Sequence, residues 1–536
     1  MNTHPLSLYE IVLAIGKFIP LWESCEHSSD EDIWYLKPKD LIAAISVNRH
    51  FHATLTPLLW SVYVESAVKS LEYPNWVRCG FFYHHIPFDI VQKNSSYIRF
   101  LDLSDYHPRY TGTVELLPLD LNFSRLQELR LSDSVDCTWA KRIILAHPEL
   151  RVLHWVRTRK KIKREEVKDF ESVLSLRRLR YLGLDGWWFF TQQLYGALAN
   201  NAEHLEELRL TRCHSIIAKW SKKDDTGKLR IAPIASMEKG GEEFEPLKRM
   251  CWRIRLEKLK ALHLDVEHNL CPLTLYWLVN VVPALETIVF GDLLGNTAKA
   301  LSLTLRKSCP RLQTIKLGHI WEVNSWRPHQ HSDALYLTNA CAPGHLVHAS
   351  LDGWRIDNAN MEALSLHRDS LETLELAIRD DDYRDSFSNL GTILERCSRL
   401  KHLSVYFFRY GNRCDRRQPL LFLDKLATCS DLVRLEFHGF TLADDNNHLD
   451  DTGSDEGALR VRIDRNQELD DYGPEANGFG EPGWRELFLG GFLDMCEGEC
   501  CDHFKRLVCD AIGSLSSLKC VVFGVTGYVK VLSSSS

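Results

Sequence analysis

The segment Leu205-Glu-Glu-Leu208-Arg-Leu210-Thr-Arg-Cys213 decides the fold. It has leucines at its first, fourth and sixth positions and a cysteine at its ninth, which is the pattern L-x-x-L-x-L-x-x-N/C. Because leucine is common and short apolar runs are ambiguous, one match would mean little. The evidence is that the pattern recurs along the chain.

Related segments recur on both sides of this stretch. Most start about 24–34 residues apart, close to the roughly 20–29 residues expected for repeats of this pattern. The gaps after Leu205 and Leu432 are about twice as long, so each contains an insertion or a degenerate repeat. The segments begin at Ile98, Leu126, Leu150, Leu179, Leu205, Leu259, Leu285, Leu312, Leu346, Leu371, Leu400 and Leu432, with weaker ones at Trp484 and Leu518.

A second pattern precedes the first. Cys309, Cys397 and Cys429 each lie three residues before an opening leucine, and short amphipathic runs come before them. These runs predict helices, so each unit reads as helix, tight turn and strand. Such a unit cannot bury its apolar face alone, and stacked neighbours build one continuous core. The second and third apolar positions, such as Leu208 and Leu210, should point into that core, and the residues beside them should point away.

These repeats resemble the cysteine-containing leucine-rich repeats of F-box proteins. The resemblance implies an α/β fold, a leucine-rich-repeat solenoid in which an arc or horseshoe of parallel strands lines the concave side and helices line the convex side. We expect the solenoid to span residues 98–532, with insertions at about 215–250 and 443–482. The second insertion is acidic and poor in aromatic residues, which predicts disorder.

The bulk composition is that of an ordinary soluble chain, with 45% hydrophobic and 26% charged residues among 536. It has no apolar run of about 18 residues and no signal-peptide pattern, so we expect no membrane span and a cytoplasmic or nuclear location. The 16 cysteines are then expected to be reduced. Residues 444–475 hold about 11 acids against 3 bases, which roughly accounts for the net charge of −7. The remainder is near neutral, which argues against nucleic-acid binding.

Residues 1–64 differ in texture, with predicted helices after Pro5 and from Lys39 to Phe51. Their order resembles the F-box, in which Leu-Pro-x-Glu-Ile is followed by Asp-Leu, Val-x-Arg-x-Phe and Pro-Leu-Leu-Trp. Two departures are the reversed order Pro5-Leu6 and an acidic extra segment at 21–37. The matching positions are Pro5, Leu6, Glu10, Ile11, Asp40, Leu41, Val47, Arg49, Phe51, Pro57, Leu58, Leu59 and Trp60.

The F-box resemblance implies a small all-helical module that binds a Skp-type adaptor and, through it, a cullin. Such docking buries spaced aliphatic and aromatic anchors against a partner. The expected adaptor-binding residues are Pro5, Leu6, Ile11, Ile15, Leu41, Val47, Phe51, Pro57, Leu58 and Trp60. The alternative is a helical cap over the end of the repeats, because solenoid ends need caps. Residues 65–97 would join the module to the repeats.

The concave face is where a solenoid usually binds its partner. Its central column is predicted from the residue between the two inward positions of each repeat. The basic members of this column, on the hypothesis that they read an acidic or phosphorylated client, are Arg130, His154, Arg209, His263 and Lys316. The alternative is a solvated sheet face that is polar for solubility alone.

Other notable stretches have plainer explanations. The basic run at 159–164 is a nuclear-import or phosphate patch or a solvated loop, and the aromatic run at 187–190 is a binding ridge or helix packing into the core. The cysteines at 496–501 lack paired metal-ligand spacing. The G-x-G-x-x-G match at 478–483 lacks a preceding strand.

No G-x-S-x-G, H-E-x-x-H or P-loop motif is present, so we expect no catalysis, no cofactor and no metal. The resemblance to F-box proteins implies a substrate-recognition subunit of a Skp-cullin-F-box-type ubiquitin ligase that binds a client protein on its repeats. The alternative is a leucine-rich-repeat interaction scaffold with a helical N-terminal cap.

Overall fold

The computed structural model describes a chain of strands and helices that falls into two units. Unit 1 lies within Met1–Glu242, and unit 2 within Glu243–Val461 and Glu468–Ser536. The described residues are 8–19, 21–25, 33–36, 39–64, 88–104, 121–157, 169–216, 254–264, 270, 272–291, 295–317, 333–351, 358–378, 383–407, 425–426, 428–438, 484–486, 515, 517–518, 520–523 and 526–530.

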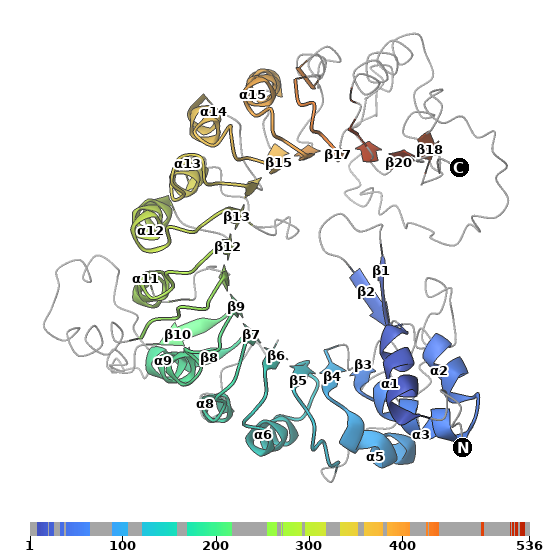
Figure 1. Cartoon of the computed structure of the whole chain (residues 1–536). Coiled ribbons are helices and arrows are strands. Elements are labelled where there is room, and N and C mark those ends of the chain that lie inside the picture. Colours follow the sequence, from blue (N-terminus) through green and yellow to red (C-terminus); the bar gives the residue numbers. More distant parts are fainter. Residues whose placement is uncertain are drawn as a thin grey trace, which may run out of the picture. The chain divides into compact units, whose positions relative to one another are not determined.

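Unit 1 begins with helices and continues as a parallel sheet in the order β3-β4-β5-β6-β7-β9 (Figure 1). Helices α6, α8 and α9 lie along one side of its strands. Its elements are α1 (Tyr9–Phe18), β1 (Trp22–Cys25), β2 (Ile33–Leu36), α2 (Lys39–Ile45), α3 (Arg49–Leu59), β3 (Val62–Val64), α5 (Phe88–Asn94), the 3-10 helix η2 (Ser95–Tyr97), β4 (Phe100–Leu103), β5 (Glu128–Leu131), α6 (Cys137–Ala146), β6 (Val152–Val156), α8 (Glu171–Leu174), β7 (Tyr181–Asp185), β8 (Trp188–Phe190), α9 (Thr191–Asn200), β9 (Glu207–Thr211) and β10 (His214–Ile216).

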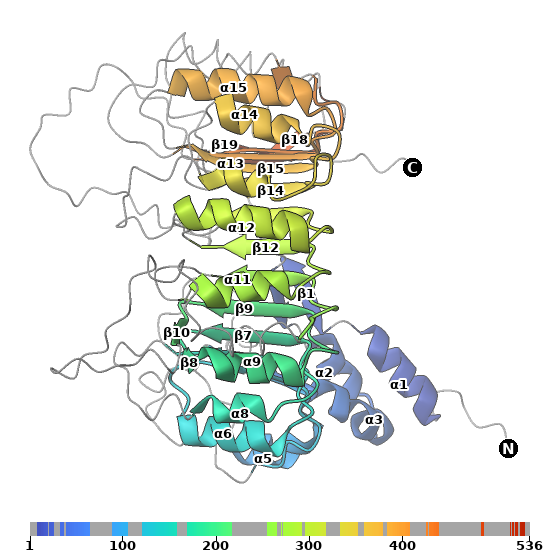
Figure 2. The same cartoon turned by 90° about the vertical axis from the view of Figure 1, so that its left-hand side faces the viewer.

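Unit 2 repeats the alternation of strand and helix, and its helices α11 to α15 stack one above another beside the strands (Figure 2). Its parallel strands run in order from β11 to β17 and then β19. Its elements are β11 (Ala261–Leu264), α11 (Pro272–Asn280), β12 (Thr287–Phe290), α12 (Gly295–Ser308), β13 (Thr314–Leu317), α13 (Asp333–Thr338), β14 (His348–Leu351), α14 (Asn358–Ser365), β15 (Thr373–Ile378), α15 (Tyr383–Arg396), β16 (His402–Phe407), β17 (Arg434–His438), β18 (Trp484–Glu486), β19 (Cys520–Phe523) and β20 (Thr526–Lys530).

The recurring leucine pattern predicts the parallel strands of both units. In each predicted segment from Ile98 to Leu432, and again at Leu518, a parallel strand begins two residues after the opening residue. The opening residues are buried, and so are inward positions such as Leu208 and Leu210. The prediction of an α/β fold with a parallel sheet is therefore confirmed within each unit.

A shared carbonyl sets the register between successive strands. The carbonyl of Arg99 accepts hydrogen bonds from two consecutive amides, Gln127 N at 2.8 Å and Glu128 N at 2.9 Å. In unit 2 the carbonyl of Lys260 accepts from Glu286 N and Thr287 N in the same way. In both cases the accepting carbonyl belongs to the residue that directly follows the opening residue of the repeat, so successive strands align position by position.

Buried polar side chains at the ends of several helices form hydrogen bonds to the repeat before them. Asn201 donates from Nδ2 to the carbonyls of Leu176 and Ala197, and its Oδ1 accepts from the amide of Leu179 at 2.8 Å. The thiols of Cys309 and Cys429 likewise donate to carbonyls in the preceding repeat, at Val279 and Leu394. These groups lie in the core, where an unpaired carbonyl would be costly.

The N-terminal helices form a small core of their own. Val12, Leu41, Phe51 and Leu55 are buried together. At Gly16 a Cβ would lie only 2.4 Å from Leu55 Cδ2, so glycine allows α1 to approach α3 closely. Contrary to the expectation of an all-helical module, β1 and β2 form an antiparallel pair within the acidic segment at 21–37.

Three further sequence expectations differ from the structure. The helix expected from Lys39 to Phe51 is broken, because Asn48 is extended and its side chain caps α3 by accepting from the amide of Phe51. Three residues of the aromatic run at 187–190 form β8 (Trp188–Phe190), paired with β10, rather than a helix. The weak repeat at Trp484 gives β18, which runs antiparallel to β20. The expected insertions lie almost wholly outside the described residues.

Replacing Asn201 with leucine should lower the free energy of unfolding by about 3 kcal/mol, because two carbonyls and one amide lose their buried partner. Chemical denaturation measures the change. Glu203→Gln, at an exposed position of the same turn, is the control and should stay within about 0.5 kcal/mol of the wild type. If Asn201→Leu changed the free energy of unfolding as little as the control does, these hydrogen bonds would not hold neighbouring repeats together.

Candidate functional site

The open face of the unit 1 sheet carries the predicted central column. The register pairs Asp102 with Arg130, Arg130 with His154, His154 with Gly183 and Gly183 with Arg209. The inward neighbours of these residues are buried leucines and, beside His154, the buried Trp155, so alternation places the column on the face opposite the helices. The structure therefore brings Arg130, His154 and Arg209 onto one face of consecutive strands.

Two rings and two arginines occupy the middle of this face. The His154 and Tyr181 rings meet edge to face, with centroids 6.2 Å apart. Arg130 lies over the Phe100 ring at 5.3 Å, and its Nη1 is 3.8 Å from Asp102 Oδ2. Arg209 is hydrogen-bonded to the Tyr181 hydroxyl.

Burial keeps both rings neutral at physiological pH. It lowers the pKa of His154, and the nearby Arg209 and Arg130 lower that pKa further. Burial also raises the pKa of Tyr181, against the opposing effect of Arg209. At neutral pH the positive charge of this group therefore belongs to the arginines, and the rings supply neutral polar atoms.

Unit 2 has an open face of the same kind. The register places His263, Val289, Lys316, Ser350 and Glu375 in one column. His263 and Lys316 therefore occupy their expected column, although they belong to unit 2 and the other three basic residues belong to unit 1.

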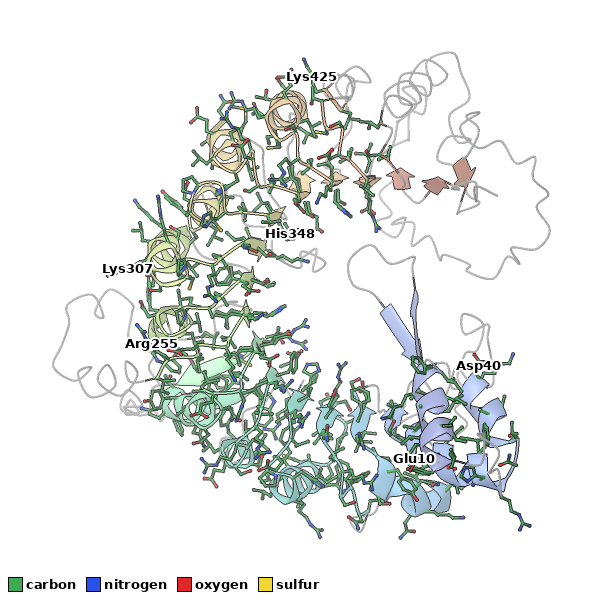
Figure 3. The ribbon with its side chains drawn as sticks, in the orientation of Figure 1. Glu10, Asp40, Arg255, Lys307, His348 and Lys425 are labelled. Carbon is green, nitrogen blue, oxygen red and sulfur yellow. The ribbon has the colours of Figure 1, made fainter. Side chains whose placement is uncertain are left out.

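Further along the unit 2 column the face becomes acidic. Ser404 and Glu436 continue the register, and Ser404 Oγ donates to the buried Glu436 carboxylate at 3.0 Å. Figure 3 shows His348 on the strand side of this unit and Lys307 on the helix side. Burial lowers the pKa of His348 and of His402, whose strands flank β15 on this face.

The expected adaptor-binding residues of the N-terminal module divide into buried and exposed groups. Leu41 and Phe51 lie in the helical core, so their side chains hold the helices together rather than facing a partner. Val47 is 63% and Ile15 is 38% exposed. The half-buried members are Ile11, Pro57, Leu58 and Trp60, and Pro5 and Leu6 lie outside the described residues.

The exposed apolar surface of the module is larger than the motif suggests. Phe18 at the end of α1 is 88% exposed, and Leu8, Tyr9 and Ile42 are also exposed. Figure 3 places the polar residues Glu10 and Asp40 on the same two helices, α1 and α2. Sequence comparison with a motif missed these apolar residues because they are not motif positions, although the amphipathic spacing of α1 could have indicated them.

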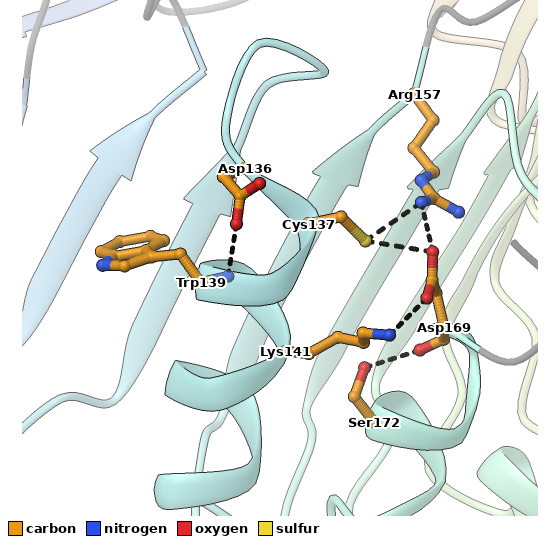
Figure 4. A network of polar contacts seen from close by, with 7 residues as sticks. All are labelled: Asp136, Cys137, Trp139, Lys141, Arg157, Asp169 and Ser172. Carbon is orange, nitrogen blue, oxygen red and sulfur yellow. Dashed lines mark hydrogen bonds and ion pairs between the residues drawn. The ribbon is translucent and has the colours of Figure 1, made fainter. Parts of the chain in front are cut away.

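A charged network lies between α6, β6 and the start of α8 (Figure 4). The Asp169 carboxylate accepts from Lys141 Nζ at 2.5 Å, from Arg157 Nη2 at 2.6 Å and from the Cys137 thiol at 3.1 Å. Asp136 caps α6 by accepting from the amide of Trp139. Sequence analysis missed this network because its members are far apart in the chain.

The electrostatics of the network keep the Cys137 thiol protonated. Burial raises the pKa of the Cys137 thiol to about 11, and its hydrogen bond to Asp169 adds to the rise. Burial alone would raise the pKa of Asp169, but hydrogen bonds from Lys141, Cys137 and Arg157 outweigh it and lower that pKa. The Cys137 thiol is therefore protonated at neutral pH and donates to the paired Asp169 carboxylate.

Aromatic residues complete this network. Arg157 lies over the Trp187 ring at 4.4 Å, and Trp187 Nε1 donates to the carbonyl of Trp155 at 2.9 Å. Trp187 and Phe189 are fully buried, so they pack into the core as expected, although from a strand segment. The more exposed Trp188 stacks on His214 with centroids 3.9 Å apart.

The remaining sequence features lie partly inside and partly outside the described ranges. Within the described ranges, no three His, Cys, Asp or Glu side chains gather into a metal-binding group. The basic run at 159–164, the cysteines at 496–501 and the glycines at 478–483 lie outside those ranges. The cysteines at 137, 213, 309, 341, 397 and 429 carry free thiols, as predicted.

Two general findings bear on the class of protein. Among the described helices, none combines the length and apolarity that a membrane crossing requires. A scan of the sequence against protein-family models and a search of curated proteins found no match.

Replacing Asp169 with asparagine should lower the pKa of the Cys137 thiol, although burial still holds that pKa above its ordinary value, and the thiol should react faster at a given pH. The change removes a carboxylate that raises the thiol pKa and leaves Lys141 and Arg157, which lower it. Iodoacetamide labelling at pH 8, followed by mass spectrometry of the Cys137 peptide, should be at least about tenfold faster. Asp185→Asn, which removes the partner of Arg212, is the matched control and should leave the rate unchanged.

The same variant should lose about 3 kcal/mol of unfolding free energy, because two partly buried cations lose their partner. The pKa of Asp169 is lower in the folded state than its ordinary value of 3.8, so its contribution is present above that value and lost as the pH falls below it. The stability difference between wild type and variant should therefore shrink in acid below about pH 4. A difference that is constant with pH would contradict this account.

Proposed function

We propose that the chain is the substrate-recognition subunit of a Skp-cullin-F-box-type ubiquitin ligase. In this proposal the N-terminal helices belong to an F-box-like module that binds a Skp-type adaptor. The parallel strands of each unit are parts of a leucine-rich-repeat solenoid, and their open faces bind a client protein. The chain itself performs no chemistry.

The distribution of exposed apolar side chains is the observation that carries the proposal. Among the described residues ten large hydrophobic side chains are exposed, and six of them lie at positions 8–47. The six are Leu8, Tyr9, Ile15, Phe18, Ile42 and Val47, and we call them the helical patch. Scattered exposed leucines are ordinary, whereas a concentration on one small module is typical of a docking surface.

The core of the module supports the same function in a different way. Leu41 and Phe51 match motif positions and are buried with Val12 and Leu55. They set the spacing between the helices, so that the neighbouring positions Ile42 and Val47 face outward. A rigid presentation of apolar anchors lowers the entropy lost on binding.

The function of such a subunit is to hold a client near the transfer machinery. The gain comes from the raised effective concentration of client lysines, not from a catalytic group on this chain. The polar open faces suit this role, because polar and charged side chains confer specificity on protein contacts.

The alternative function, a repeat scaffold with a helical cap, also has an observation in its favour. β3 follows α3 directly and pairs in parallel with β4. The carbonyl of Ser61 accepts from Arg99 N and Phe100 N, as the carbonyls of later units do. The module thus closes the first edge of the sheet, but capping alone does not account for an outward-facing helical patch.

The double variant Phe18→Asp/Val47→Asp should abolish binding to a purified Skp-type adaptor, with a loss of at least about 100-fold in affinity, because two anchors become charged. Isothermal titration calorimetry on the full chain measures the affinity. Both side chains are exposed, so the circular dichroism and melting temperature should stay unchanged.

The matched control is Leu145→Asp/Leu303→Asp, which places the same charges at exposed leucines of α6 and α12 outside the module. This variant should bind the adaptor like the wild type. If the wild-type chain does not bind the adaptor, the scaffold alternative replaces the ligase proposal.

A further inference from the structure

Gly183 creates an unusual floor on the open face of unit 1. A Cβ at this position would lie 2.6 Å from His154 Cδ2 and 2.8 Å from the Tyr181 hydroxyl oxygen. No side chain fits there without displacing the rings. The absence of a side chain therefore lets His154 and Tyr181 fold down over the strand, where they form a low aromatic surface.

Two arginines flank this floor on opposite sides. Arg130 lies on β5, one strand before His154, and Arg209 lies on β9, one strand after Gly183. Both guanidinium groups act electrostatically on His154 and on Tyr181, so both charges lie near the two rings. Arg209 also acts on the Tyr181 hydroxyl through a side-chain hydrogen bond that lowers the pKa of Tyr181.

The acidic groups of this face hold the arginines without cancelling them. Asp102 lies 3.8 Å from Arg130, whose side chain is still 45% exposed. Asp185 forms a two-point pair with Arg212, through Nε at 2.7 Å and Nη2 at 2.6 Å. Glu207 opposes the arginines at Tyr181, but Arg209 is the larger charge effect there.

We propose that the His154–Tyr181 floor and its flanking arginines, Arg130 and Arg209, bind one phosphate group carried by a client protein. The phosphate site stands on this geometry, and only the identity of its carrier rests on the proposed ligase function. Guanidinium groups approaching from two sides match the three acceptor oxygens of a phosphate monoester. The neutral Tyr181 hydroxyl supplies a further donor, and the neutral His154 ring adds no competing charge.

The site differs from a generally basic surface in its dependence on Gly183. A basic strip attracts any anion in proportion to its charge, and salt screens that attraction. A built site needs the rings to stay low so that a phosphate can sit between the arginines. Replacing Gly183 therefore distinguishes a built phosphate site from a generally basic surface.

Nuclear magnetic resonance of the full chain with 13C-labelled histidine tests the proposal, with the His154 ring signal assigned from a His154→Gln sample. The probes are O-phosphoserine, phenyl phosphate and inorganic phosphate, and serine and sodium chloride at equal ionic strength are the blanks. We expect a saturable shift of the His154 signal with all three phosphates and with neither blank.

The variants sharpen this test. Arg130→Met and Arg209→Met should each weaken phosphate binding about tenfold or more, because each removes charge-assisted hydrogen bonds. Gly183→Ala should do the same by lifting the rings, while Gly196→Ala, on α9, is the matched control and should bind like the wild type. A linear shift that sodium chloride reproduces, or equal binding by Gly183→Ala with intact folding, would overturn the proposal.

The carrier is tested separately. Adaptor affinity should be unchanged in the Arg130→Met and Arg209→Met variants, because these residues lie outside the helical patch. Phosphate binding without adaptor binding would retain the site and reject the ligase function. Adaptor binding without phosphate binding would retain the ligase function and reject the site.

Discussion

In both units one main-chain carbonyl before a strand accepts hydrogen bonds from two successive amides of the next strand. The carbonyls of Arg99 and Lys260 show this arrangement at equivalent places. A register slip of one residue would break both bonds and would turn every inward leucine outward. The shared carbonyl therefore fixes which side chains reach the open face. The column from Asp102 to Arg209 is a direct consequence of that alignment.

The side of the sheet that faces the helices satisfies its own polar groups. Carbonyls of the preceding repeat accept hydrogen bonds from Asn201, Cys309 and Cys429. Asp169 neutralises Lys141 and Arg157. Among the described residues, the open faces and the helical patch carry the side chains that we propose to bind partners. The molecule thus separates the groups that hold it together from the groups that we propose to bind.

The sequence predicts local periodic features well and long-range contacts poorly. The strand positions follow from leucine spacing, because burying one face of a strand requires alternation. Motif comparison alone did not separate Leu41 and Phe51, which are buried, from Val47, which is exposed, because all three are apolar members of one motif. The β8–β10 pair escaped prediction because its strands are only three residues long and β8 consists of aromatic residues. Cys137, Arg157 and Asp169 meet only through the fold, since no local pattern links residues up to 32 positions apart.

We propose that the helical patch is a docking surface distinct from the sheet faces. Hydrogen–deuterium exchange of the full chain, with and without a Skp-type adaptor, tests it most directly. If the helical patch binds the adaptor, the amides of α1 and α2 should exchange more slowly after the adaptor is added. The amides of β5, β6, β7 and β9 should exchange at the same rate as before. Unchanged exchange in α1 and α2, or protection confined to the strands, would contradict it.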